Sequence, residues 1–135
     1  MSESLRETWP AEPVTVPRAR TAVVELARRA KATADALDDI RLAVSEAVTN
    51  VVVHAYIGEP PGPLHVDARV DGRRLHVEVR DEGAGLRPRP DSPGLGVGLP
   101  LIAAVTESLH LSNADGEPSR VMMTFDLDCH RPAVA

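Results

Sequence analysis

Apolar residues recur every three or four positions in two segments of the first half of the chain, which predicts two amphipathic helices. The first runs from residue 17 to about residue 31 and starts with Pro17, a position where helices tolerate proline. The second runs from about residue 37 to residue 56. Its apolar stripe consists of Leu37, Ile40, Val44, Val48 and Val51. A third helix is predicted from Leu99 to about Leu109, with Pro100 in its first turn.

Alternation of apolar and polar residues predicts strands elsewhere along the chain. The predicted strands span residues 5–9, 64–70, 75–79, 110–112 and 121–127. Asp71-Gly72 is typical of a tight hairpin between the second and third of them. The order β-α-α-β-β-α-β-β predicts a two-layer α/β sandwich, a mixed sheet with the helices on one face. We expect a single domain over residues 1–135, ordered from about residue 5 to residue 127.

Composition excludes several kinds of site. The chain has a net charge of −5 and no basic run, and its aromatic residues are Trp9, Tyr56 and Phe125, so direct nucleic-acid binding is not expected. Cys129 stands alone, and the five histidines lack zinc-binding spacings. No apolar stretch reaches the roughly 20 residues of a membrane span, so a cytoplasmic protein without a membrane partner is expected. The single lysine, Lys31, follows no glycine-rich turn, which excludes a P-loop.

Glu46, Asn50 and His54 form the first cluster that could carry chemistry. They are spaced four residues apart on the second predicted helix, and each step moves about 6 Å along the axis and about 40° around it. The three therefore lie on one polar stripe. An asparagine oxygen is a suitable ligand for Mg²⁺, and a glutamate one turn away could accept the proton of an attacking hydroxyl. A solvated helix face would give the same spacing.

Two glycine-rich segments follow. Asp81 ends a predicted strand, where its carboxylate could accept a hydrogen bond from the amine of adenine, and Gly83 and Gly85 leave room for a flat base. Further along, alternate glycines open the third helix, where backbone N–H groups and the helix dipole favour phosphate. These glycines are Gly94, Gly96 and Gly98. Either segment alone is a weak signal: the first is also typical of a glycine-rich turn, and a lone Gly-x-Gly-x-Gly is a loop more often than a site.

The three clusters in this order resemble the GHKL (Bergerat) ATP-binding fold: a Glu-x-x-x-Asn helix, then a strand with Asp-x-Gly-x-Gly, then Gly-x-Gly-x-Gly-Leu opening a helix. The segment Ser-Glu-Ala-Val-Thr-Asn-Val-Val-Val-His-Ala-Tyr at residues 45–56 is similar to the anti-sigma-factor serine kinases within that superfamily. The resemblance covers about residues 5–127. It implies ATP and Mg²⁺ as cofactors.

The resemblance also implies a role for each matching residue. Glu46 would be the general base toward a serine of the protein substrate, and Asn50 would ligate Mg²⁺. Asp81 would recognise adenine, supported by Ser119 where the family usually has threonine. The remaining nucleotide-binding positions would be Gly83, Gly85, Gly94, Gly96, Gly98 and Leu99. The implied protein partners are an anti-sigma-factor antagonist as substrate, a sigma factor to be sequestered, and a second copy of the chain in a homodimer.

Two other functions remain open from the sequence. A regulator that binds nucleotide and partners without transferring phosphate is favoured by the few residues, Leu86 to Pro93, between the glycine-rich segments. Glu46 and Asn50 favour the kinase instead. A histidine-kinase catalytic domain is the other alternative, although no phosphoacceptor helix hairpin precedes residue 17.

Overall fold

The computed structural model describes residues 3–83, 95–112 and 119–132, with the backbone alone described at 95–98. Five strands and three helices lie within these ranges. They are β1 (Ser4–Pro10), α1 (Thr15–Arg29), α2 (Ala34–His54), β2 (Pro63–Asp71), β3 (Arg74–Asp81), α3 (Leu95–Val105), β4 (Ser108–Ser112) and β5 (Ser119–Asp126). The element order is the predicted one. None of the helices in these ranges is both long and apolar enough to cross a membrane.

The five strands form one sheet in the order β1-β2-β3-β5-β4, and every neighbouring pair is antiparallel. The prediction of a mixed sheet was therefore wrong. The α3 crossover does connect two strands that run in the same direction, β3 and β4, but they are not neighbours. β5 lies between them and runs antiparallel to both.

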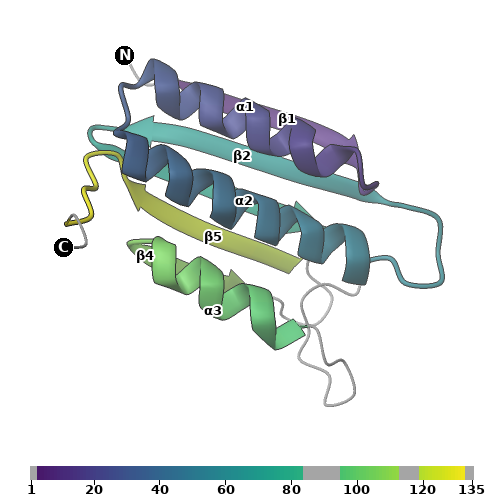
Figure 1. Cartoon of the computed structure of the whole chain (residues 1–135). Helices are drawn as coiled ribbons and strands as arrows, with labels where there is room; N and C mark the ends of the chain where they lie inside the picture. Colours follow the sequence, from purple (N-terminus) through teal and green to yellow (C-terminus); the bar gives the residue numbers. More distant parts are fainter. Residues whose placement is uncertain (1–2, 84–94, 113–118, 133–135) are drawn as a thin grey trace.

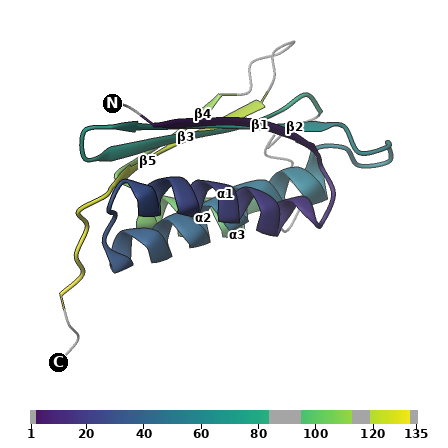
Figure 2. The same ribbon diagram turned by 90° about the horizontal axis from the view of Figure 1, so that it is seen from above.

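The helices cover one face of the sheet, as predicted (Figures 1 and 2). α2 lies in the middle and packs against α1 on one side and α3 on the other. Alternate residues of β2, β3 and β5 face the helices and form the core with them. Its strand residues include Leu64, Val66, Leu75, Val77, Val79, Val121, Met123 and Phe125, each at most 2% exposed. The opposite face of the sheet carries the polar residues of the same strands.

The ends of α2 and α3 differ from the predicted ones. α2 begins at Ala34 because Thr33 caps it: the Thr33 hydroxyl accepts a hydrogen bond from the Ala36 N–H at 3.1 Å. α3 begins at Leu95 and not at Leu99, so Pro100 lies in its second turn, where its missing N–H removes one helical hydrogen bond. α3 also ends early, because the Glu107 N–H bonds to the Thr124 carbonyl at 2.8 Å and starts the pairing with β5.

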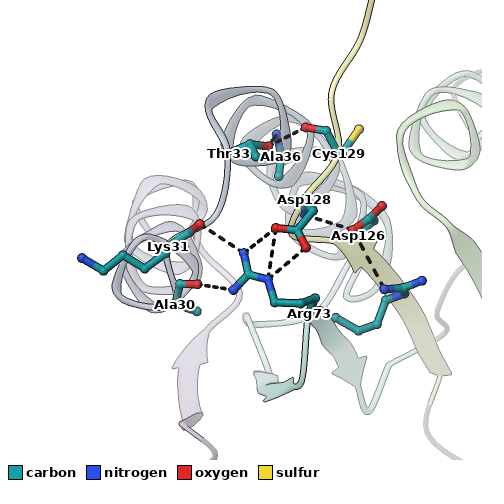
Figure 3. A network of polar contacts seen from close by, with 9 residues as sticks. Ala30, Lys31, Thr33, Ala36, Arg73, Asp126, Asp128 and Cys129 are labelled. Carbon is teal, nitrogen blue, oxygen red and sulfur yellow. Dashed lines mark hydrogen bonds and ion pairs between the residues drawn. The ribbon is translucent and has the colours of Figure 1, made fainter.

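Arg73, in the β2–β3 turn, ties together three segments at one end of the molecule (Figure 3). Its guanidinium donates to the carbonyls of Ala30 and Lys31 at 2.7 and 3.2 Å, and to the Asp128 carboxylate at 2.7 Å. The hydrogen bond from Arg73 lowers the pKa of Asp128. The Thr33 hydroxyl donates to the Cys129 carbonyl beside this network. The C-terminal segment is thereby fixed against the start of α2.

The core predicts a stability test on β5. Phe125 is 2% exposed on the helix-facing side of β5, whereas Met122 is 38% exposed on the opposite face. Phe125→Ala should lower the free energy of unfolding by about 3–5 kcal/mol, because it removes a buried ring and leaves a cavity. Met122→Ala, on the same strand, should change it by less than about 0.5 kcal/mol. Urea unfolding of both variants measures the difference, and equal losses would contradict the packing described here.

Candidate functional site

Asp81 occupies the buried face of the sheet at the end of β3. The core-facing positions of β3 are Leu75, Val77 and Val79, and the two-residue period of a strand places Asp81 next in that row. Its side chain follows the row toward the helices, and the residue is only 2% exposed. A carboxylate thus stands where the strand pattern calls for an apolar residue.

The surroundings of Asp81 disfavour its charged form. Burial, the largest cause, raises the pKa of Asp81 above its ordinary value, and the neighbouring Glu82 carboxylate raises it further. The Gly83 N–H acts in the other direction by donating to Oδ1 of Asp81 at 2.9 Å. One carboxylate oxygen is therefore held by the turn that follows β3. The other can accept a hydrogen bond from an amine such as that of adenine.

Ser119 lies directly across the sheet from Asp81. The register of β3 and β5 pairs the two residues, and Ser119 is 6% exposed on the same buried face. Side chains of directly opposed residues have Cβ atoms about 4.5–5.5 Å apart. The structure thus brings together two residues that lie far apart in the sequence and that the motif comparison had paired.

Gly83 lies against the end of α2. A Cβ atom at this position would be 2.1 Å from the Ala55 carbonyl oxygen and 3.0 Å from Cδ1 of Tyr56. The closeness of the Ala55 carbonyl is therefore enough by itself to require glycine at position 83. This reason differs from the predicted one, room for a base, and that role of Gly83 stays a prediction.

Asn50 and Glu46 both lie on α2, at the half that ends beside Gly83. Asn50 is 7% exposed, and among the residues that the structure describes its Nδ2 atom has no hydrogen-bond partner. Glu46 is half-buried one turn earlier. An amide can rotate to exchange its nitrogen and oxygen, so Asn50 can turn an oxygen toward the same space. A buried amide with unused capacity suits a residue that ligates a cation carried by a ligand.

Three of the five buried polar or charged residues within the described ranges lie at this end of the molecule. The buried polar or charged residues of the described ranges are Thr15, Asp39, Asn50, Asp81 and Ser119. Two of them are satisfied elsewhere by the chain itself, Thr15 by the Pro10 carbonyl and Asp39 by the Arg131 guanidinium. The other three are residues predicted for the nucleotide site. Of the three, Asn50 has an Nδ2 atom without a partner among the described residues, and because burial of such a group is costly, its placement suits a ligand.

The phosphate-binding glycines are described only in part. Gly85 and Gly94 lie outside the described residues. Gly96 and Gly98 lie in the first turn of α3, whose first four N–H groups have no partner within the helix. α3 begins at the end of the molecule where α2 ends, so this helix N-terminus is oriented toward the same region (Figure 1). Leu99, predicted to bind the nucleotide, packs against the core, and its role toward a nucleotide stays a prediction.

Tyr56 is a residue of this region that the sequence analysis did not assign to the site. Its hydroxyl donates to the Pro63 carbonyl at 2.5 Å and accepts from the Glu82 N–H at 3.0 Å. Burial, the largest cause, raises the pKa of Tyr56. Tyr56 is the only tyrosine of the chain and follows the Glu46–His54 stripe. Its backbone partners, Pro63 and Glu82, lie 7 and 26 residues further along the chain, and no sequence rule predicts such contacts.

A wide hollow of about 920 Å³ lies elsewhere, over the uncovered face of the sheet. Its lining includes Arg6, His76, Glu78, Arg120 and Met122. These are the outward positions of strands whose other face is core. None of the predicted site residues lines this hollow, and the chemistry discussed above belongs to the helix-covered face.

Comparison with known proteins establishes the family to which the chain belongs. The histidine kinase-like ATPase domain family matches the chain over residues 9–125. The chain belongs to this family. The match includes both helices of the first half, the strand that ends at Asp81, and Ser119. A kinase-like ATPase domain implies ATP binding, and the sequence resemblance is confirmed at this level.

Individual relatives of this family carry names from bacterial regulation. The anti-sigma F factor of Clostridium acetobutylicum is 29% identical over 116 residues, which are 78% of this chain and 80% of that protein. The serine-protein kinase RsbW of Listeria innocua is 36% identical over 83 residues, 62% of this chain and 53% of that protein.

A solved structure agrees with the fold. The crystal structure of the RsbU and RsbW domains of a Mycobacterium tuberculosis protein matches with a TM-score of 0.72 and 23% identity, covering 97% of this chain and 34% of that chain. The two-layer sandwich of this ATPase family is therefore confirmed.

The buried carboxylate predicts a pH-dependent stability effect of Asp81→Asn. The pKa of Asp81 is higher in the folded protein than its ordinary value of 3.8, which applies to the unfolded chain. Ionisation of Asp81 therefore destabilises the fold as the pH rises above 3.8. An asparagine keeps an oxygen for the Gly83 N–H but carries no charge. The variant without nucleotide should therefore be at least as stable as the wild type at pH 7.

The pH profile separates this cause from others. Thermal unfolding between pH 4 and pH 7 should show the advantage of Asp81→Asn shrinking as the pH falls, since protonated Asp81 is then neutral too. Asp67→Asn, on the outward face of neighbouring β2, serves as the matched control. If the stability of Asp81→Asn relative to wild type were lower at pH 7 than at pH 4, the raised pKa of Asp81 would be contradicted.

Proposed function

We propose that the chain is an ATP-dependent serine protein kinase that acts as an anti-sigma factor. It would phosphorylate an anti-sigma-factor antagonist and sequester a sigma factor. The observation that carries the proposal is the burial of three polar groups: Asp81 at the end of β3, Ser119 opposite it at the start of β5, and Asn50 near the end of α2. The end of α2 and the start of α3 lie at the same end of the molecule (Figure 1). The names of the relatives support the biological part.

Each residue has a distinct task in this proposal. Asp81 accepts a hydrogen bond from the exocyclic amine of adenine, with Ser119 beside it on β5. The N-terminus of α3 holds phosphate oxygens through the N–H groups of its first turn, which replaces the missing P-loop lysine. Asn50 holds Mg²⁺, and ATP with Mg²⁺ supplies the phosphoryl group and neutralises its charge. Glu46 accepts the proton of the substrate serine as the serine oxygen bonds to the γ-phosphorus of ATP, while the bond from that phosphorus to the bridging oxygen breaks and ADP leaves.

The remaining parts of the proposal follow the family resemblance. The chain would form one ATP-binding domain, ordered over about residues 5–127, and would act in the cytoplasm as a homodimer. The alternative is a regulator that binds nucleotide and partners without phosphotransfer. The eight residues from Leu86 to Pro93, between the glycine-rich segments, favour it.

Nucleotide binding should be visible as thermal stabilisation. ADP with Mg²⁺ at 100 times its Kd should raise the free energy of unfolding by about 2.7 kcal/mol, because only the folded chain binds it. The melting temperature should rise with ADP–Mg²⁺, rise less when EDTA removes the metal, and rise least with GDP. An unchanged melting temperature at millimolar ADP–Mg²⁺ would refute the nucleotide site.

Substitutions on α2 should separate metal binding from proton transfer. Asn50→Ala should weaken Mg²⁺-dependent ADP binding and phosphotransfer together. Glu46→Gln should leave ADP binding nearly intact and slow transfer by about 10²–10⁴-fold, the usual loss on removing a general base. Transfer of labelled phosphate from ATP to the antagonist captured from the source cell, with ADP calorimetry in parallel, measures both effects.

A control and two contrary outcomes define this test. Glu25→Gln makes the same chemical change on the exposed side of α1 and should leave both properties unchanged. Wild-type protein that binds ATP but phosphorylates no captured partner would favour the regulator over the kinase. Full activity of Glu46→Gln would leave the kinase standing and remove Glu46 as its base.

A further inference from the structure

Tyr56 joins three segments just beyond the end of α2. Its hydroxyl bridges two backbone groups, donating to Pro63 at the start of β2 and accepting from Glu82 directly after β3. Burial raises its pKa, so the hydroxyl stays protonated and able to donate at neutral pH. The same group thus holds the start of one strand and the end of its neighbour.

The ring of Tyr56 fills space that two glycines leave open. A Cβ atom on Gly62 would lie 2.3 Å from Cε1 of Tyr56, and one on Gly83 would lie 3.0 Å from Cδ1. The first contact is closer than side-chain atoms tolerate and the second is tighter than most real contacts, so the backbone on either side lies close to the ring. The ring and hydroxyl together leave the turn at residues 81–83 little freedom to move.

That turn controls the Asp81 carboxylate. The Gly83 N–H holds Oδ1 of Asp81 at 2.9 Å, and the residue between them, Glu82, is held by Tyr56. Any shift of the turn would move the Gly83 N–H and with it the oxygen that it orients. Tyr56 itself donates no hydrogen bond to Asp81 in the structure, so its influence passes through the backbone.

We propose that Tyr56 is a positioning residue for adenine selectivity, fixing the turn at residues 81–83 so that Asp81 presents its free oxygen to the base. The proposal rests on the proposed function, because it takes Asp81 as the adenine-recognising group. It adds a residue whose phenolic hydroxyl sets the geometry of that group. Removing the hydroxyl should alter the choice between nucleotide bases more than it alters stability.

The chain offers a closely matched control at the other end of α2. The Thr33 hydroxyl also bridges two backbone groups, accepting from the Ala36 N–H and donating to the Cys129 carbonyl (Figure 3). Thr33 and Tyr56 are both half-buried, one just before α2 and one just after it. Thr33→Val and Tyr56→Phe each remove one bridging hydroxyl and keep the apolar part, but only one of them lies beside Asp81.

The test measures the Kd of ADP–Mg²⁺ and GDP–Mg²⁺ by calorimetry on the whole chain. Tyr56→Phe should weaken ADP binding by about fivefold to tenfold, the scale of one lost hydrogen bond, and should reduce the preference for ADP over GDP. Thr33→Val should lower the melting temperature and leave that preference unchanged. In an Asp81→Asn background, Tyr56→Phe should cost less than about a further twofold, because coupled residues are not additive.

A second variant keeps the test decisive if Tyr56→Phe folds poorly. Gly62→Ala pushes the ring out of place without altering Tyr56, Asp81 or the turn at residues 81–83, and it should reproduce the selective loss of ADP affinity. Amide hydrogen exchange should also become faster at Glu82 and Gly83 in either variant.

Each contrary result has its own meaning. The positioning role would be overturned if Tyr56→Phe left both the ADP affinity and the base preference unchanged. It would also be overturned if Tyr56→Phe weakened ADP and GDP binding equally and its effect added fully to that of Asp81→Asn. Either result would leave the nucleotide site standing. Wild-type protein that binds no ADP would instead refute the proposed function, and the role of Tyr56 with it.

Discussion

The burial of a carboxylate on the core-facing side of the sheet is the constraint on which the rest of the site depends. Strand geometry forces it: β3 alternates between its two faces, and Asp81 falls on the side of Leu75, Val77 and Val79. A polar group in this place costs free energy unless something pairs with it. Among the described residues, the Gly83 N–H supplies one partner. In the proposed function, the other carboxylate oxygen accepts a hydrogen bond from the amine of adenine.

α2 connects this end of the molecule to the opposite one. It packs between α1 and α3 through an apolar stripe, while Glu46 and Asn50 lie on the half that approaches the β3 turn. A side-chain hydroxyl at each of its ends, that of Thr33 or of Tyr56, bridges two backbone groups. Because a packed helix moves as a rigid body, the position of Asn50 relative to Asp81 is set at both ends. A site shared between a helix and a strand requires such a constraint, since small displacements alter the distance between ligands.

Sequence patterns were sufficient for the layers, for identifiable reasons, and they named the buried polar residues on which the proposed site is built. The apolar periods of α1 and α2 are long and uninterrupted, and the Asp71-Gly72 hairpin leaves little choice for β2 and β3. The neighbours of β5 were harder to predict. The order β3-α3-β4 suggests that β3 and β4 are adjacent parallel strands, and it says nothing about insertion of β5 between them. The start of α3 was misplaced because glycines and Pro100 oppose helix formation locally, whereas packing of Ile102 into the core favours it.

Gly83 illustrates what a motif alone does not explain. The sequence suggests that a glycine follows Asp81 to admit a flat base, but the structure gives it a prior task, since a Cβ atom would collide with the Ala55 carbonyl. The two reasons are compatible, because close contact with α2 draws the turn into the position from which its N–H orients Asp81. Gly62 makes the same kind of room for Tyr56 from the other side. Glycines on both sides of one aromatic ring thus determine how near the helix, the turn and the strand can lie. In this region the packing of the protein and the geometry of the proposed nucleotide site are set by the same contacts.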